Sequence, residues 1–281
     1  MAEQRRVLVV TDSTSDIPRH YRSDLGITVV PLSVSFGTES FRDGIDLSLT
    51  QFLERLQTAP ELPKTSQPPI ADFEAVFRDA LERGLDVVCI TISAALSGTH
   101  NSARLAAETV NADADRIRVI DSRGTSMQLG WIVIDAARLA TTGASLADVA
   151  ARAESAVSRV KLYAVLQTLD YVYKGGRIGK ASKLVGTALA IKPVLSIVDG
   201  VLVPVERVRT WKKAVTRVAE LITPTPTDIM VLHSHNLSDA QAVAAQLQQA
   251  YPQAKVDVDY AGATITTYAG PGALGVMALY P

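Results

Sequence analysis

Short runs of β-branched residues alternate with stretches of helical periodicity in the first half of the chain, and this alternation limits the fold more than any other feature. The run DVVCITI is apolar almost throughout, as expected of a strand that helices bury on both faces. Such strands alternating with helices predict parallel strands joined by crossover helices. The expected strands are Val7–Val10, Ile27–Leu32, Asp86–Ile92 and Ile117–Ile120. We expect an α/β fold whose N-terminal domain is an open, mostly parallel sheet flanked by helices.

Helix-end signals support this alternation. Ser48 and Gln51 match the S-x-x-Q capping box, in which the two side chains satisfy free amides at a helix start. That helix should run to about Gln57. A second helix is expected over Asp72–Arg83, with Gly84 as the residue that ends it. Two longer helical stretches follow at 124–141 and 146–158.

The second half changes character and predicts a mixed or antiparallel sheet. Asp199-Gly200 lies between two β-branched runs, and Asp-Gly favours a two-residue hairpin turn. Helices are expected at Trp211–Leu221 and Ser238–Ala250, covering one face of the sheet. The expected strands are Leu162–Leu166, Pro193–Val198, Val201–Val205, Asp228–Leu232, Val256–Tyr260 and Leu274–Tyr280. We therefore predict two domains, an N-terminal α/β domain over 1–160 and a C-terminal α/β domain over 161–281. The cleft between them is the default ligand site.

Composition and charge exclude several classes of function. The chain has 28 Lys and Arg against 29 Asp and Glu, with the basic residues scattered, so nucleic acid is not an expected partner. The apolar run near the N-terminus stops at Val10, too early for a signal-peptide core. Leu129–Ala140 is too short to span a bilayer, so no stable membrane insertion and a cytoplasmic location are expected. The single cysteine, Cys89, lies in DVVCITI and is expected to be a buried structural thiol.

Two hydroxyl-rich loops indicate a binding site. They are LPKTSQPP at 62–69 and ISAALSGT at 92–99, and each abuts a segment expected to be buried. Loops TDSTSDIP and DSRGTS also follow strands, and ligands of open α/β sheets bind beyond the carboxyl ends of strands. No phosphate loop, metal-ligand cluster or nucleophile elbow accompanies them. Ser97 precedes an expected helix start, where free amides favour an anion; the alternative is that Ser97 or Thr99 is only an N-cap.

Eight ordered sequence blocks resemble the signature blocks of the DegV family, over about residues 6–280. They are VTDSTSDIP, TSQPP, LSGTHNSA, VIDSR, YKGGRIGKAS, IKPVLSIVDG, RVRT and GPGALG. The resemblance implies a two-domain lipid carrier that holds one long-chain fatty acid, such as palmitate or oleate, in a tunnel between the domains. It also implies a candidate partner, the catalytic subunit of a fatty acid kinase, which phosphorylates the bound carboxylate.

The resemblance also implies roles for particular residues. Thr65 in TSQPP and Ser97 in LSGT match the residues that hydrogen-bond the fatty acid carboxylate in the family. Gly98 would bring its amide toward the head group, or would serve only as a turn residue. Arg177 in GGRI and Arg209 in RVRT match family arginines near the mouth of the site. Arginine there suits a carboxylate or a partner's phosphate; a surface or inter-domain salt bridge is the alternative for each.

Tyr268 departs from the family pattern. Many kinase-linked members have histidine before the GPG-type loop, whereas this chain has Tyr268 in TTYAGPG. A phenol donates a hydrogen bond to a carboxylate, but its pKa of about 10 makes it a poor proton shuttle near neutrality. His235 and Asn236 in LHSHN match a further family block. His233 and His235 share one strand face without an evident third ligand, so no metal site is expected.

Two alternatives to the carrier stay open from the residues. A serine-dependent hydrolase would pair Ser97 with His100, although no G-x-S-x-G elbow is present. A nucleotide-binding enzyme would fit the α/β layout, although neither a Walker loop nor a GxGxxG follows the first strand. The favoured hypothesis is a non-catalytic long-chain fatty acid-binding protein for lipid transport and fatty acid metabolism. It requires no catalytic residue, cofactor or metal.

Overall fold

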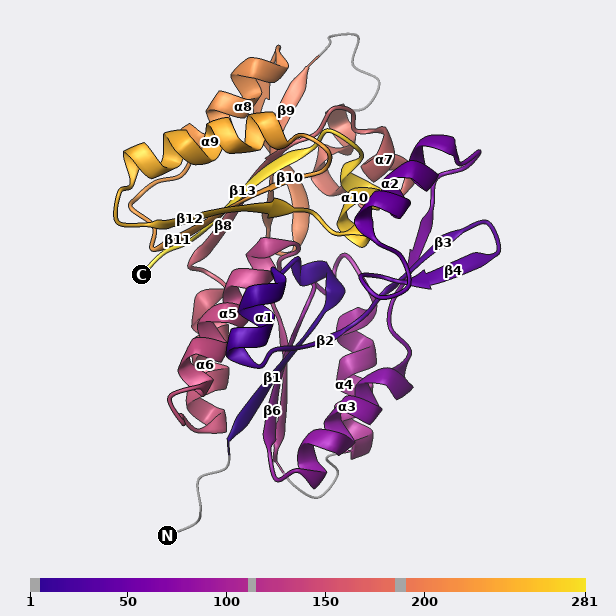
Figure 1. The fold of residues 1–281 in the computed structure, drawn as a ribbon, viewed down its shortest axis with the longest axis vertical. Helices are drawn as coiled ribbons and strands as arrows, with labels where there is room; N and C mark the ends of the chain where they lie inside the picture. Colours follow the sequence, from indigo (N-terminus) through magenta and orange to yellow (C-terminus); the bar gives the residue numbers. More distant parts are fainter. Residues whose placement is uncertain (1–5, 111–114, 185–190) are drawn as a thin grey trace.

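The computed structural model describes residues 6–110, 115–184 and 191–281. The expected parallel sheet is present in the first half (Figure 1). It has the order β2-β1-β6-β7, and neighbouring strands pair in parallel. Its strands are β1 Val7–Asp12, β2 Thr28–Val30, β6 Asp86–Thr91 and β7 Ile117–Asp121. Each expected strand of this half is therefore confirmed within a few residues.

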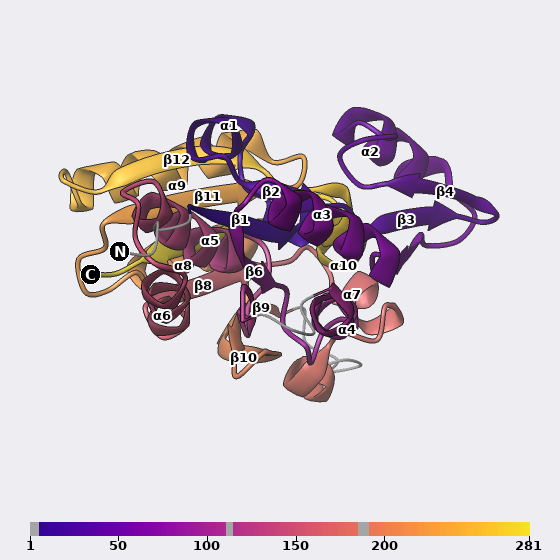
Figure 2. The same ribbon diagram turned by 90° about the horizontal axis from the view of Figure 1, so that it is seen from below.

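Helices cover both faces of this sheet because its central strands are apolar on both sides. Val87 and Cys89 of β6 pack with α3 Ile70–Glu82 and α4 Thr99–Val110. The intervening residues Val88 and Ile90 face the opposite helical layer. That layer consists of α1 Arg19–Leu25, α5 Met127–Ala140 and α6 Leu146–Ala156 (Figures 1 and 2). The alternation confirms that Cys89 is a buried core thiol, and burial raises its pKa well above the ordinary range.

The second half forms a six-stranded mixed sheet of order β10-β9-β8-β13-β11-β12. Its strands pair antiparallel except β11 with β12. They are β8 Val160–Val165, β9 Lys192–Val198, β10 Val201–Val208, β11 Asp228–His233, β12 Lys255–Tyr260 and β13 Leu274–Leu279. The expected hairpin joins β9 to β10, with positive φ angles of 51° at Asp199 and 79° at Gly200. Helices α8 Trp211–Glu220 and α9 Leu237–Ala250 cover one face (Figure 1).

Helix α5 lies between the two large sheets. Its residues from Met127 to Ala137 are all buried, which explains why this stretch is apolar nearly all round. The helix contacts β1 and β6 of the first sheet and β8 and β13 of the second. The Trp131 Nε1 donates a hydrogen bond to the Met277 carbonyl oxygen at 3.0 Å. One apolar core therefore runs from the first sheet through α5 into the second.

A third, small sheet was not expected from the sequence. Its order is β4-β3-β5, with β3 Ser33–Phe36, β4 Glu39–Arg42 and β5 Lys64–Ser66. Helix α2 Leu49–Thr58 and helix α10 Ala263–Ala269 pack beside it, and the capping box of Ser48 and Gln51 is confirmed. Thr65 was expected in a loop but lies on β5, where it pairs with Val34. The remaining short elements are α7 Asp170–Lys174 and 3-10 turns at Ser13–Ser15 and Gly179–Leu184.

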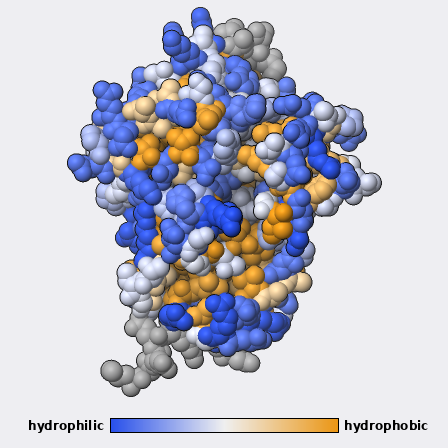
Figure 3. Space-filling view, in the orientation of Figure 1, coloured by the Kyte–Doolittle hydropathy of each residue, from blue (hydrophilic) through white to orange (hydrophobic). Residues whose placement is uncertain are grey.

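Among the described residues, every helix is too short or too polar to span a bilayer. On the face of Figure 1, apolar residues appear in separate patches divided by polar side chains (Figure 3). The apolar side chains of the second sheet that face α10 instead line an internal pocket.

Candidate functional site

The main pocket lies between the second sheet and the loops that follow strands of the first. One side consists of apolar side chains from β8, β9, β10, β11 and β13. Leu162, Leu195, Ile197, Leu202 and Leu232 are examples. The other side consists of α10 and of the loops after β1, β6 and β7. The space free of protein atoms is about 1040 Å³, part of it open to solvent. A pocket lined mostly by aliphatic side chains suits a ligand that is itself mostly hydrocarbon.

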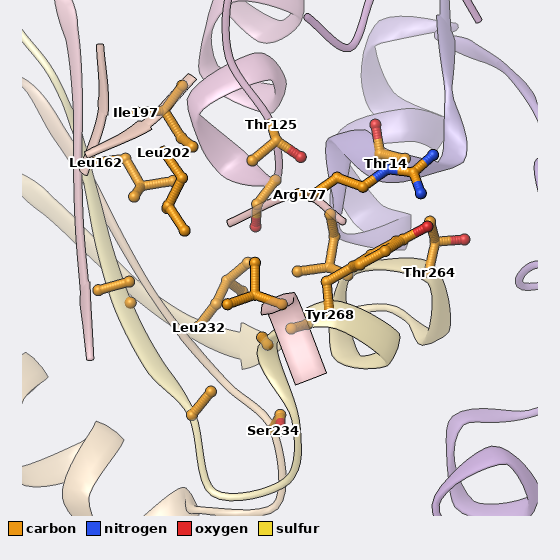
Figure 4. Close-up of a pocket in the computed structure, with 18 of the residues that line it drawn as sticks. Thr14, Thr125, Leu162, Arg177, Ile197, Leu202, Leu232, Ser234, Thr264 and Tyr268 are labelled. Atoms are coloured by element: carbon orange, nitrogen blue, oxygen red, sulfur yellow. The ribbon is translucent and has the colours of Figure 1, made fainter. Parts of the chain in front are cut away.

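Polar side chains gather at one end of this pocket. Thr65, Ser97, Arg177 and Tyr268 all line it, although they come from four separate parts of the chain. Figure 4 shows Tyr268 and Arg177 on one side of the cavity, opposite Leu162 and the other aliphatic side chains. The structure thus brings together four of the six residues expected at the site. Ser234 lines the pocket away from this group (Figure 4), but the rest of the wall is mostly apolar, which matches an amphipathic ligand.

Thr65 and Tyr268 form a hydroxyl pair. The Thr65 Oγ1 lies 2.5 Å from the Tyr268 OH, and either atom can be the donor. Because each hydroxyl has one proton and the bond between them uses only one, the other proton remains for a ligand. The ring of Tyr268 rests against the backbone at Gly175: a Cβ added there would lie 2.5 Å from Tyr268 Cδ1. A glycine at 175 therefore leaves room for the ring that carries this phenol.

Ser97 performs the local capping role that the sequence left open. Its Oγ accepts a hydrogen bond from the Thr99 backbone N at 3.3 Å, and it lies 2.9 Å from the Thr99 Oγ1. When the Thr99 hydroxyl donates in the second contact, the Ser97 proton is available to a ligand. Capping and ligand binding are therefore compatible at Ser97, which also lines the pocket.

Arg177 supplies positive charge at the same end. Its guanidinium carbon lies 5.2 Å from the centre of the Tyr268 ring, within the range of a cation–π contact. The Arg177 Nη1 donates to the Gly175 carbonyl oxygen at 2.8 Å, and the Nε donates to the Leu96 carbonyl oxygen at 3.3 Å. These contacts fix the side chain between the loop of Ser97 and the ring of Tyr268.

The other two expected contacts lie outside the pocket lining. Arg209 is exposed at the end of β10, just before α8. Gly98 lies beneath the side chain of Gln67, whose Oε1 would be 1.9 Å from a Cβ at position 98. Gln67 Nε2 in turn donates to the Ser102 Oγ of α4. Gly98 therefore allows the TSQPP segment to approach the start of α4 closely.

Buried aspartic acid side chains position the loops and helix that form the polar end. Asp12 accepts from the backbone N of Thr14 and of Ile92, which ties the loop after β1 to the segment leading to Ser97. Asp16 accepts from the Gly262 backbone N at 3.0 Å and from the Ser126 Oγ. Burial is the main cause that raises the pKa of Asp16 to about 8 and the pKa of Asp12 above its usual range.

Sequence reasoning missed five other hydroxyl residues that line the pocket, namely Thr14, Thr125, Ser126, Ser234 and Thr264. The Thr264 Oγ1 donates to Asp43 at 2.6 Å, and burial raises the pKa of that carboxyl. Asp43 also accepts from the Thr264 backbone N, so it caps the start of α10. The TDST loop was an available signal for Thr14, because it follows a strand of the parallel sheet. Thr264 had no comparable local signal.

The histidines do not form a catalytic or metal arrangement in the described residues. The hydrogen bonds of Ser97 join it to Thr99, whereas His100 Nδ1 lies 3.1 Å from the Thr91 Oγ1. His233 Nδ1 accepts from the Asn236 backbone N, and burial lowers the pKa of His233. His235 has a positive φ of 61° in the turn that follows β11. No group of three or more potential metal ligands occurs among residues 6–110, 115–184 and 191–281.

Comparison with known proteins gives consistent matches over nearly the whole chain. Residues 6–280 match the family model described as an uncharacterised protein of the DegV family. A DegV domain-containing protein of Streptomyces coelicolor is 36% identical over 97% of this chain and 98% of its own length. Protein DegV of Bacillus subtilis is 34% identical over 96% of this chain and 98% of its own.

Several solved structures also resemble this chain over nearly its whole length. The fatty acid-binding DegV family protein from Thermus thermophilus has a TM-score of 0.90 and 33% identity, covering 98% of this chain and all of its own. DegV of Bacillus subtilis, described as a fatty acid binding protein, has a TM-score of 0.88 and 33% identity, covering 99% of this chain and all of its own. A stearic acid-binding protein from Eubacterium ventriosum has a TM-score of 0.87 and 27% identity, covering 97% of each chain.

Proposed function

The chain belongs to the DegV family, and we propose that it binds one long-chain fatty acid, such as palmitate or oleate, in the pocket described above. The single observation that carries the proposal is the pocket itself, which has a mostly apolar wall and a group of hydroxyls and an arginine in its lining. The names of the Thermus and Bacillus relatives, both fatty acid-binding, support the same ligand class. The pocket would lie between an N-terminal and a C-terminal domain that meet near residue 160.

The carboxylate would be held by two hydroxyl donors. In this arrangement the Thr65–Tyr268 pair contributes one free proton and Ser97 contributes another, so each carboxylate oxygen receives one hydrogen bond. Arg177 lies beside Tyr268 and would neutralise the anion. Gly98 and Arg209 are proposed to act differently, Gly98 through packing against Gln67 and Arg209 through contact with a partner.

The acyl chain would supply most of the binding free energy. Burial of fourteen methylenes at about 0.8 kcal/mol each gives a gross gain on the order of 11 kcal/mol. Hydrogen bonds to the carboxylate largely replace those that water made, so they contribute less and mainly orient the ligand. Because the binding free energy comes mainly from the acyl chain and the carboxylate contacts mainly orient it, the site suits a carrier that recognises a class of fatty acids.

We further propose that the protein is a non-catalytic cytoplasmic carrier in fatty acid transport and metabolism. It would present the carboxylate to the catalytic subunit of a fatty acid kinase. The contacts of Ser97 and His100 do not form the serine–base pair that a hydrolase needs. In the kinase reaction a carboxylate oxygen would attack the γ-phosphorus of ATP, giving an acyl phosphate and ADP.

Ligand binding can be tested directly. Organic extraction of the purified protein, followed by mass spectrometry, should release a long-chain fatty acid, and the delipidated protein should bind palmitate or oleate at micromolar concentration. Thr65→Ala with Ser97→Ala should weaken binding by about tenfold, because the Ser97 donor is lost and the Tyr268 hydroxyl loses the partner that positions it. Failure of the delipidated wild-type protein to bind either acid would refute the proposal.

A matched control separates the loss of carboxylate contacts from an unspecific effect of removing two hydroxyl groups. Thr109→Ala with Ser155→Ala also removes one threonine and one serine hydroxyl. Each of these hydroxyls is exposed and bonds a carbonyl oxygen in its own helix. This control should bind fatty acid as the wild type does. The kinase role has its own readout, namely hydroxylamine trapping of an acyl phosphate after addition of a kinase catalytic subunit and ATP.

A further inference from the structure

The second sheet is split between two of its central strands. Strands β8 and β9 pair only through Ala164 with Leu195 and Val165 with Val194. Each of the two strands pairs along its whole length with its other neighbour, β8 with β13 and β9 with β10. The segments 160–163 of β8 and 196–198 of β9 therefore do not pair with one another, although the register would bring them opposite.

A second pocket occupies this split. Its lining includes Lys161 and Tyr163 from β8 and Ser196 and Val198 from β9. The remainder comes from β7, from the loop after it, from α5 and from the end of α6. The empty space is about 1330 Å³, part of it open solvent, and its walls carry more polar groups than those of the fatty acid pocket. A route from the interior to solvent would thus pass between the two strands.

Ile197 belongs to the lining of both pockets. Its side chain is 6% exposed and packs in the central apolar core. Figure 4 shows Ile197 with Leu162 and Leu202 on the side of the fatty acid pocket away from Tyr268 and Arg177. An acyl chain whose carboxylate lies at the polar end would therefore point its terminal methyl toward Ile197.

We infer that Ile197 sets the longest acyl chain that the pocket accepts, an inference that rests on the proposed fatty acid binding. Chains that end before Ile197 stay inside the apolar wall. A longer chain must displace Ile197 and enter the split, where its end meets polar groups and water, so its added methylenes gain little. The polar end selects carboxylates, and Ile197 selects length.

The test is a chain-length profile of delipidated protein, measured by native mass spectrometry with an equimolar mixture of saturated acids from lauric to behenic. Ile197→Ala removes three carbons and joins the two pockets. We expect the bound population to shift toward longer acids, with the ratio of arachidic to palmitic acid rising about tenfold. Ile197→Phe should shift the population toward shorter acids, because the larger side chain fills space at the end of the pocket.

Ile229→Ala is the matched control. Ile229 is also fully buried in the second sheet, but it packs against α8 and α9 and lines neither pocket. This variant should keep the wild-type profile. An unchanged profile in both Ile197 variants would overturn the inference while leaving fatty acid binding intact. If Ile197→Ala fails to fold, Ile197→Phe alone decides, since a wild-type profile in that variant contradicts the inference. Absence of any bound acid in the wild type would instead refute the proposed function.

Discussion

The Tyr268 OH and the Thr65 Oγ1 lie 2.5 Å apart although 203 residues separate them in the chain. This contact joins helix α10 to the small sheet at the polar end of the pocket. Tyr268 therefore faces the proposed carboxylate site. The two hydroxyls share one hydrogen bond and should therefore behave as a unit when a ligand binds.

Tyr268→Phe should weaken palmitate affinity by about fivefold, the value of one ordinary hydrogen bond. Isothermal titration calorimetry on delipidated protein measures the change. Thr65→Ala and the Thr65→Ala, Tyr268→Phe double variant complete a thermodynamic cycle. Because the hydroxyls act together, the double variant should lose less affinity than the sum of the two single losses. Strictly additive losses would show that the pair is not a unit.

Ser97→Ala should lower both stability and affinity, since Ser97 caps the Thr99 amide and lines the pocket. Loss of a cap costs about 1 kcal/mol of unfolding free energy, which urea denaturation measures. Affinity for palmitate should fall about fivefold in addition. A variant that is destabilised but binds with wild-type affinity would assign Ser97 to capping alone.

Gly175→Ala should weaken fatty acid binding, because the added Cβ would collide with the Tyr268 ring and move its hydroxyl from Thr65. Gly176→Ala is the control. No atom lies within 4 Å of a Cβ there, but its φ of 75° strains a non-glycine residue. The control should therefore lose stability and keep its palmitate affinity, whereas equal affinity losses in both variants would point to general distortion of the loop.

Stability should depend on pH through Asp16. Burial raises the folded-state pKa of Asp16 from 3.8 to about 8, so the native protein holds a proton that the unfolded chain has lost between those pH values. The native state binds more protons there, so the free energy of unfolding falls as pH rises from about 4 to about 8. Asp16→Asn retains an acceptor for the Gly262 amide and cannot ionise.

Asp16→Asn should therefore show a flatter profile of unfolding free energy against pH than the wild type. Urea denaturation at intervals from pH 5 to pH 9 provides the comparison, and the difference between the two proteins isolates Asp16 from Asp12 and Asp43, whose pKa values are also raised by burial. Parallel profiles would mean that Asp16 does not titrate in this range.

The sequence predicted the two large sheets and most helices because their signals are local. The apolar run of β6, the Asp199-Gly200 turn and the capping box of Ser48 each need only a few neighbouring residues. The third sheet gave only a weak signal. Strand β3 alternates polar and apolar residues over SVSF, but β5 has three residues and β4, with the sequence ESFR, has only one apolar side chain. Four residues are the shortest run in which such an alternation indicates a strand.

The site was predictable in part. The hydroxyl-rich loops drew attention to Thr65 and Ser97, the resemblance to the DegV family added Arg177 and Tyr268, and the structure brings all four to one pocket. The contact of Tyr268 with Thr65, the support from Asp16 and the position of Ile197 depend on pairings between distant segments. Lining residues such as Leu162 and Leu232 look identical to core residues in a sequence, since both are simply apolar.

Helix α5 packs against both large sheets. The two halves of the chain therefore have separate sheets but are stabilised by one common apolar core. Pulling the sheets apart would strip Trp131 of its contact with Met277 and expose to water the face of the helix that packs on β8 and β13. Under the proposed function, a hinge opening between the halves would therefore be a costly route for a fatty acid. Loading and release would use local movement, either of the small elements around Thr65 and α10 or at the split between β8 and β9, so the speed of exchange would be governed at the periphery of the molecule.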